Sequence, residues 1–344
     1  MTDCYPWQQN IWEKLAKGRN FRNHAILLTG RKGIGKYEFA RNMAKALLCA
    51  KPTENQRACG ACASCHWFTQ NSHPNFCLVA PEAFVQETEE PHEKTRDDSV
   101  SASAKKSLSQ QISIEQIRQL DDFVYLTGHQ QGYKIIVIYP AEAMNPSASN
   151  ALLKKLEEPP ENVLLILVSH QPRHLLPTIR SRCQQIAMPV PDLATSAAWL
   201  KQQGIKNPEA SLACAGYSPL TALQMAQGET AMQHARFIQQ ISDPDRLDPL
   251  VLADALQKTQ LSLVVDWLQK WCYDLLSYTT TGKVRYYIDQ SVAIKALSAQ
   301  MNIHDCSAFT RELNAKQHFA HHPLNPRVFL EDVLVDYARL MVRK

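Results

Sequence analysis

The sequence predicts an α/β domain built on a parallel sheet, followed by an all-α region. Three observations support this prediction. A glycine-rich stretch, residues 30–37, stands between an apolar strand at 25–28 and a helical pattern at 38–48. Further short apolar segments then alternate with helical patterns, which is typical of parallel sheets covered by helices. Beyond about residue 191, strand signals fade and helical periodicity continues through the chain.

The elements follow from local patterns in chain order. Residues 5–15 form an amphipathic pattern with Trp7 and Trp12 on one side. Ser113 and Gln116 fit a capping box, so a helix is expected at 114–126. The remaining expected elements of the first domain are strands at 76–79, 134–139 and 163–169 and a helix at 147–158, ended by Pro159-Pro160.

Helices are expected throughout the second part of the chain. A small helical bundle is predicted at 193–227, and longer helices at 237–344. Trp267 and Trp271 lie one turn apart in an apolar stripe. We expect this stripe to form core or a subunit contact rather than a ligand site.

Composition narrows the class of protein. The chain has 344 residues, enough for two or three domains, with 45% hydrophobic and 20% charged residues. It contains no apolar run of the roughly 18 residues that a membrane span needs, and no secretory signal pattern is visible. Ten cysteines then indicate a reducing, cytoplasmic setting, and a net charge of +4 is too mild to predict nucleic-acid binding.

The glycine-rich stretch has the spacing of a phosphate-binding loop. The pattern G-x-x-x-x-G-K is met by Gly30, Gly35 and Lys36, with Gly33 as a further glycine. Loop amides and the helix N-terminus would attract a polyphosphate. The next residue should be Ser or Thr, whose hydroxyl binds Mg²⁺, but it is Tyr37. The loop therefore keeps the phosphate cradle and lacks one metal ligand.

The residues needed for hydrolysis are also missing after the next candidate strand. A phosphate-loop ATPase carries Asp-Glu there, to hold Mg²⁺ and to activate water. Here the strand is followed by Tyr139-Pro140, and the nearest carboxylate is Glu142. We therefore expect no hydrolysis. Binding of ATP or ADP through Lys36 and the loop amides stays open. The missing Mg²⁺ ligand counts against it, because the charge of the triphosphate would lack its usual counter-ion.

Four cysteines have the spacing of a metal site. Cys49 is followed by Cys59, Cys62 and Cys65 in a doubled C-x-x-C pattern. Four thiolates can enclose Zn²⁺ tetrahedrally and leave no open position, so a structural zinc is predicted. His66 and His73 are spare donors, and four unligated thiols are the alternative.

Residues 81–110 change in character. They run from a charged segment, 87–98, into a Ser-, Ala- and Lys-rich segment, 99–109. This composition predicts a disordered insertion, to which no function is assigned.

One arginine stands in a distinctive context. Arg182 lies between Ser181 and Cys183, after the strand at 163–169. A guanidinium matches phosphate oxygens and could reach a nucleotide on a neighbouring subunit. On residue type alone, a surface or salt-bridged arginine is the simpler interpretation.

Two stretches together carry a family resemblance. Residues 149–160, SNALLKKLEEPP, and 177–183, PTIRSRC, with the cysteine group after the loop helix, resemble bacterial DNA polymerase III clamp-loader subunits of the AAA+ class. The resemblance implies a RecA-like AAA+ domain at 1–188, with a zinc module at about 49–65 and the insertion at about 81–110. It also implies a small helical lid domain at 189–233 and a C-terminal helical collar domain at 234–344.

The same resemblance implies a function. Gamma/tau motor subunits of this family hydrolyse ATP, whereas delta-prime subunits have a degraded nucleotide site, which Tyr37 and Tyr139-Pro140 match. Arg182 would then act in trans on the ATP of a neighbouring gamma/tau subunit. The implied complex also contains a delta subunit and loads the sliding clamp onto primed DNA at the replisome. Ser169 or His170 stands where a motor carries its sensor residue.

Two other functions stay open. The chain could be an active AAA+ ATPase that tolerates Tyr37 and recruits Glu142 as its base. It could also be a zinc-dependent nucleic-acid binder on a relic nucleotide fold, although clustered Lys and Arg are scarce.

Overall fold

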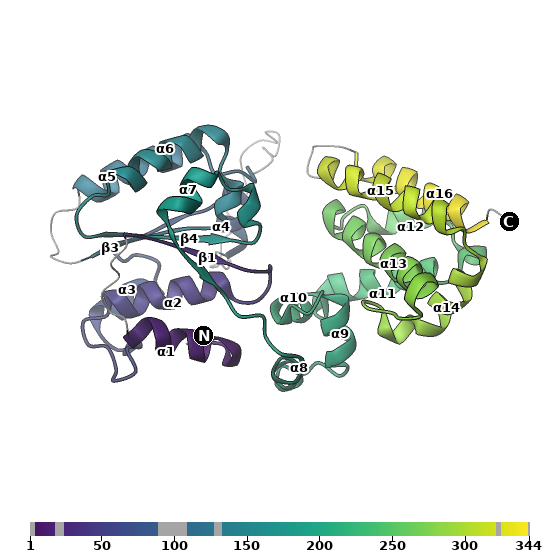
Figure 1. Ribbon diagram of the computed structural model, residues 1–344, viewed down its shortest axis with the longest axis horizontal. Coiled ribbons are helices and arrows are strands. Elements are labelled where there is room, and N and C mark those ends of the chain that lie inside the picture. The colour runs from purple at the N-terminus through teal and green to yellow at the C-terminus, as the bar shows by residue number, and fades with distance from the viewer. Residues whose placement is uncertain (1–3, 18–23, 89–108, 127–132, 321–324, 343–344) are drawn as a thin grey trace, which may run out of the picture. The chain divides into compact units, whose positions relative to one another are not determined.

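The computed structural model describes residues 4–17, 24–88, 109–126, 133–320 and 325–342. The chain divides into two compact units, residues 1–190 and 191–344, which are described separately (Figure 1). In the described part of the chain, no helix has the length and apolar character needed to cross a membrane.

The first unit is built on a five-stranded parallel sheet with the order β2-β3-β4-β1-β5. This parallel order, with the glycine-rich loop directly after β1, agrees with the α/β domain that the sequence predicts. The strands are β1 (Ala25–Thr29), β2 (Phe76–Val79), β3 (Lys134–Ile138), β4 (Val163–Ser169) and β5 (Gln184–Ala187). Every residue of the central strand β4 is buried, because helices cover both faces of the sheet (Figure 1).

Alternation along the strands explains this layering. Ile26 and Leu28 of β1 pack with α1 and α2 on one face, whereas Leu27 packs with α5 and α6 on the other. The helices of this unit are α1 (Gln9–Lys17), α2 (Lys36–Leu48), α3 (Ala63–Thr69), α4 (Glu82–Thr88), α5 (Ile114–Leu126), α6 (Pro146–Glu157) and α7 (Pro177–Arg182). Short 3₁₀ segments are η1 (Pro6–Gln8), η2 (Ala141–Ala143) and η3 (Pro172–His174).

Two local predictions differ from the structure. The edge strand β5 was not predicted, because Gln184 and Gln185 are polar and exposed and leave no apolar alternation. The predicted disorder of 81–110 is wrong for α4, whose Phe84 packs against aromatic rings of the domain. Residues 89–108 of that segment lie outside the described part of the chain.

The second unit is helical in its described residues. Its helices are α8 (Leu193–Gln202), α9 (Pro208–Cys214), α10 (Pro219–Met225), α11 (Gly228–Ile241), α12 (Pro249–Leu256), α13 (Leu261–Thr281), α14 (Ser291–Gln300), α15 (Ile303–Phe319) and α16 (Pro326–Val342), with η4 (Pro244–Arg246) and η5 (Ile288–Gln290). Trp267 and Trp271 of α13 are fully buried and form its core. The division of this unit into a lid at 189–233 and a collar at 234–344 stays a prediction.

Candidate functional site

The glycine-rich loop links β1 to α2, as the sequence predicts. Gly33 and Gly35 adopt φ angles of 78° and 82°, in the left-handed region that side chains rarely enter. Gly35 stands directly before the first residue of α2, Lys36. The loop therefore has the strand–loop–helix geometry that orients backbone N–H groups toward an anion.

The N-terminal segment packs onto this loop. A Cβ atom on Gly35 would lie 2.5 Å from the Tyr5 ring, so no larger residue fits there. Gln8 donates through Nε2 to the carbonyls of Ile34, at 3.0 Å, and Gly35, at 2.7 Å. Sequence reasoning missed Tyr5 and Gln8, because a single polar residue inside an amphipathic pattern gives no sign of a distant partner.

Lys36 is bonded within its own domain. Its side chain is buried, and Nζ donates to the carbonyls of Gly30, at 2.8 Å, and Arg31. The third partner is Nδ1 of His170, at 2.7 Å. Burial, together with Lys36, lowers the pKa of His170 to about 3, so the ring is neutral and accepts this hydrogen bond. Burial also lowers the pKa of Lys36 to about 8, against the opposing effect of Glu142. The three hydrogens of the ammonium group are therefore all taken by protein atoms.

Three aromatic rings pack against one another beside the phosphate loop. The ring of Tyr37 lies 4.6 Å from that of Tyr139 and 5.2 Å from that of Phe84. The rings of Phe84 and Tyr139 are 4.8 Å apart. We call Tyr37, Phe84 and Tyr139 the aromatic cluster. Burial raises the pKa of both tyrosines, so the phenols stay protonated and offer no anionic ligand to a cation.

Glu142 binds the backbone that follows β4. It lies in η2, and its Oε1 accepts the backbone N–H groups of His170, at 2.8 Å, and Gln171, at 3.2 Å. Its Oε2 is buried without a partner in the described residues, as is Oγ of Ser169. Glu142 therefore fixes the turn after β4, and His170, at the predicted sensor position, instead binds Lys36.

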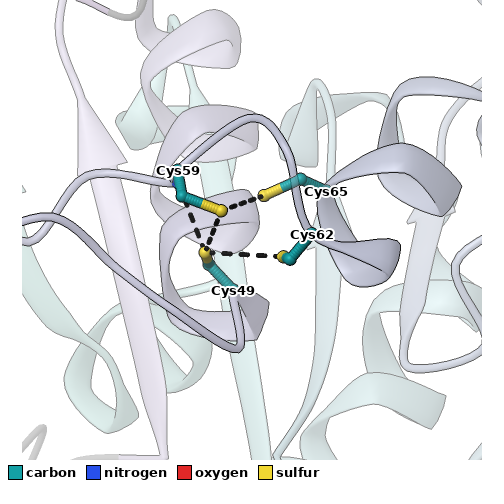
Figure 2. Close-up of side chains that lie close together, drawn as sticks. All are labelled: Cys49, Cys59, Cys62 and Cys65. Atoms are coloured by element: carbon teal, nitrogen blue, oxygen red, sulfur yellow. Dashed lines mark hydrogen bonds between the residues drawn. The ribbon is translucent and has the colours of Figure 1, made fainter.

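The four predicted cysteines come together at the end of α2 and the start of α3 (Figure 2). Their Sγ atoms all lie within 4.8 Å of one another. Cys49 lies 3.5 Å from Cys59 and 3.8 Å from Cys62, and Cys59 lies 4.0 Å from Cys65. A tetrahedral Zn²⁺ with bonds of about 2.3 Å separates its sulfurs by about 3.8 Å. The four thiols therefore match a zinc site in number and spacing.

The spare histidine donors are not part of this group. His73 is buried, and its Nε2 lies 2.9 Å from Ser64 Oγ while its Nδ1 accepts the N–H of Asn75 at 3.0 Å. Ser64 also donates to the carbonyl of Leu48, at 2.6 Å. His73 thus braces the segment that carries the thiols, and His66 is exposed outside the cluster.

Arg182 ends α7 on the surface of the first unit. Its Nη2 lies 2.8 Å from Oε1 of Glu157, the last residue of α6. Its Nη1 donates to the carbonyl of Thr178 at 3.1 Å. The side chain is 36% exposed. Arg182 is therefore salt-bridged at the surface, and its guanidinium still reaches solvent.

Comparisons with known proteins agree on one family. The family model described as "DNA polymerase III, delta subunit" matches residues 7–192. DNA polymerase III subunit delta' of Pseudomonas aeruginosa is 37% identical over 318 residues, covering 87% of this chain and 89% of that protein. The subunit delta' of Escherichia coli is 27% identical over 281 residues, covering 79% and 76%.

One solved structure is similar over nearly the whole chain at low identity. It is a DNA polymerase III, gamma subunit-related protein from Thermotoga maritima, 15% identical, with a TM-score of 0.41 and coverage of 97% of this chain and 99% of that one. The match to the family model spans more than half of the chain, and the Pseudomonas relative matches nearly its full length. The chain therefore belongs to the delta-prime family of DNA polymerase III subunits.

Proposed function

We propose that the chain is a non-hydrolysing clamp-loader subunit that supplies one arginine to the ATP site of a neighbour. It assembles with gamma/tau motor subunits and a delta subunit. The complex opens the sliding clamp and loads it onto primed DNA at the replisome, in the cytoplasm. The observation that carries the non-hydrolysing role is the aromatic cluster at the end of the phosphate loop.

The site chemistry supports this role in two ways. Hydrolysis needs Mg²⁺ held by a hydroxyl and a carboxylate, and a base for water. Tyr37 and Tyr139 supply neutral phenols packed against each other instead. A bound triphosphate would also have to draw Lys36 away from three protein partners. We therefore expect the loop to act as a structural turn.

The cysteine group is proposed to hold a structural Zn²⁺. Cys49, Cys59, Cys62 and Cys65 would supply all four ligands, which leaves no position for a reacting water. The ion would tie the end of α2 to the start of α3.

Arg182 is proposed as the in-trans residue because it combines surface position with restraint. Ile179 and Cys183 on either side of it are buried and anchor α7, while the guanidinium stays accessible. An arginine that reaches a γ-phosphate stabilises charge in the transition state and is worth about 10³–10⁵ in kcat at the site it serves.

ATP hydrolysis by the reconstituted loader, with clamp and primed DNA, tests the proposal. We expect the chain alone to be inert. We expect Arg182→Ala to lower the rate at the motor site that faces this chain, without dissociating the complex. Arg173→Ala, at another exposed arginine of the same unit, is the matched control and should leave the rate unchanged.

Two results would contradict the proposal. Turnover by the isolated chain would make it an active ATPase motor of the gamma/tau type. An unchanged rate with Arg182→Ala, in an intact complex, would leave the arginine without a catalytic role.

A further inference from the structure

We infer that Glu157 is a positioning residue for Arg182, so that the LEEPP stretch and the SRC stretch form one functional unit. This inference rests on the proposed in-trans role of Arg182. The first glutamate of LEEPP would affect the reaction at the neighbouring subunit by holding the arginine in place.

The contact joins two elements that are separate in the chain. Glu157 is the last residue of α6, and Arg182 is the last residue of α7. The two helices pack together, and the Nη2–Oε1 distance is 2.8 Å. The C-terminus of α6 carries the negative end of the helix dipole, which adds to the attraction for a guanidinium.

The guanidinium is held at two of its nitrogens. Nη2 binds Glu157, and Nη1 donates to Thr178 O at 3.1 Å. Nε and the remaining Nη hydrogens have no other partner in the described part of the chain. A phosphate oxygen can therefore bind Arg182 while the contact with Glu157 is kept. The carboxylate already restrains the rotamers of this long side chain. Less conformational entropy is therefore lost when Arg182 reaches the nucleotide.

The neighbouring glutamate supplies a matched comparison. Glu158 follows Glu157, is also exposed, and forms no side-chain hydrogen bond or ion pair in the described residues. Glu157→Gln and Glu158→Gln remove the same charge from adjacent positions. Only Glu157→Gln weakens the restraint on Arg182.

The experiment uses the complete loader, in which the other motor subunits carry a substitution that prevents their hydrolysis. Steady-state hydrolysis then reports only the site that faces this chain. We expect Glu157→Gln to lower kcat about 2- to 5-fold, the effect of losing one exposed ion pair, with KM unchanged. Glu158→Gln should match the native rate. Adding Glu157→Gln to Arg182→Ala should lower the rate no further, because no side chain remains to be positioned.

The outcomes separate this inference from the function on which it rests. If Arg182→Ala leaves the facing site unaffected, the in-trans function itself is wrong. If Arg182→Ala slows hydrolysis but Glu157→Gln does not, the positioning role is wrong. A faster rate with Glu157→Gln would also overturn it, because Glu157 would then sequester the arginine. Thermal unfolding of each variant shows whether a lower rate comes from lost folding.

Discussion

At the scale of single residues, the phosphate loop combines the backbone shape of an anion site with a lysine that is bound by protein atoms. The glycines keep their left-handed conformations, and Lys36 keeps its place at the start of α2. Its ammonium group binds two loop carbonyls and His170. The neutral state of His170 is essential to this arrangement, since an imidazolium could not accept a hydrogen bond.

This arrangement predicts a pH dependence. The pKa of His170 in the folded chain is about 3, below the unfolded value of 6.5. Its contribution to stability is therefore present above pH 6.5 and is lost as the pH falls toward 3, by at most about 1.4 kcal/mol per pH unit. His170→Asn keeps an acceptor for Lys36 and removes the titration. Urea unfolding at pH 7.5, 6, 5 and 4 should show a weaker loss for the variant, and parallel curves would refute the assignment.

A second prediction concerns Tyr37. Tyr37→Ser restores the hydroxyl of the phosphate-loop pattern, but Tyr139-Pro140 still supplies neither metal ligand nor base. We expect no ATP hydrolysis above background. We also expect a loss of about 2–4 kcal/mol of stability, because a buried ring is removed from the aromatic cluster. Measured turnover would show that one hydroxyl is enough to rebuild the site.

At the scale of elements, the cysteine segment and α4 show what the sequence could and could not predict. The doubled C-x-x-C spacing brought four thiols together as predicted, because the motif is local and α2 and α3 hold both ends. The order of α4 was not predictable from composition. It comes from the contact of Phe84 with rings at two distant positions, Tyr37 and Tyr139. Edge strand β5 was missed for a similar reason. Its sequence has no apolar pattern, and the strand is held by its pairing with β1.

Removal of the metal should have a structural effect. We expect about one zinc per purified chain by elemental analysis, and its loss with Cys62→Ser. A chelator should lower the melting temperature and expose residues 49–65 to proteolysis, since a structural zinc contributes directly to folding free energy. Cys77→Ser, in β2 and outside the cluster, should keep its zinc. Equal zinc content in both variants would contradict the four-cysteine site.

At the scale of the whole chain, the order of elements was the most predictable feature. Alternating strands and helices to about residue 188 and helices beyond it agree with the two compact units. The packing around the glycine-rich loop was less predictable. No pattern in the sequence indicated that Tyr5 and Gln8 pack around this loop, or that Phe84 packs against Tyr37 and Tyr139. Contacts between residues far apart in the chain leave no periodic signal.

A ligand experiment on the intact chain tests whether the loop binds nucleotide. A protein that binds Mg²⁺–ATP gains about 2.7 kcal/mol of stability at a ligand concentration 100-fold above its Kd. We expect no increase in melting temperature for this chain with millimolar ATP or ADP, with or without Mg²⁺. A gamma/tau motor subunit is the positive control. A concentration-dependent increase for this chain would show that nucleotide displaces Lys36 from its protein partners.

The aromatic cluster also constrains how this lineage can change. A return to metal-dependent catalysis would need a small hydroxyl residue at Tyr37 and an acidic pair at Tyr139-Pro140. Each of these steps taken alone leaves Phe84 facing an empty space or a buried charge, at a cost of about 2–5 kcal/mol and with no gain in activity. The packing of three rings would therefore act as an evolutionary ratchet against the return of a metal site at this loop.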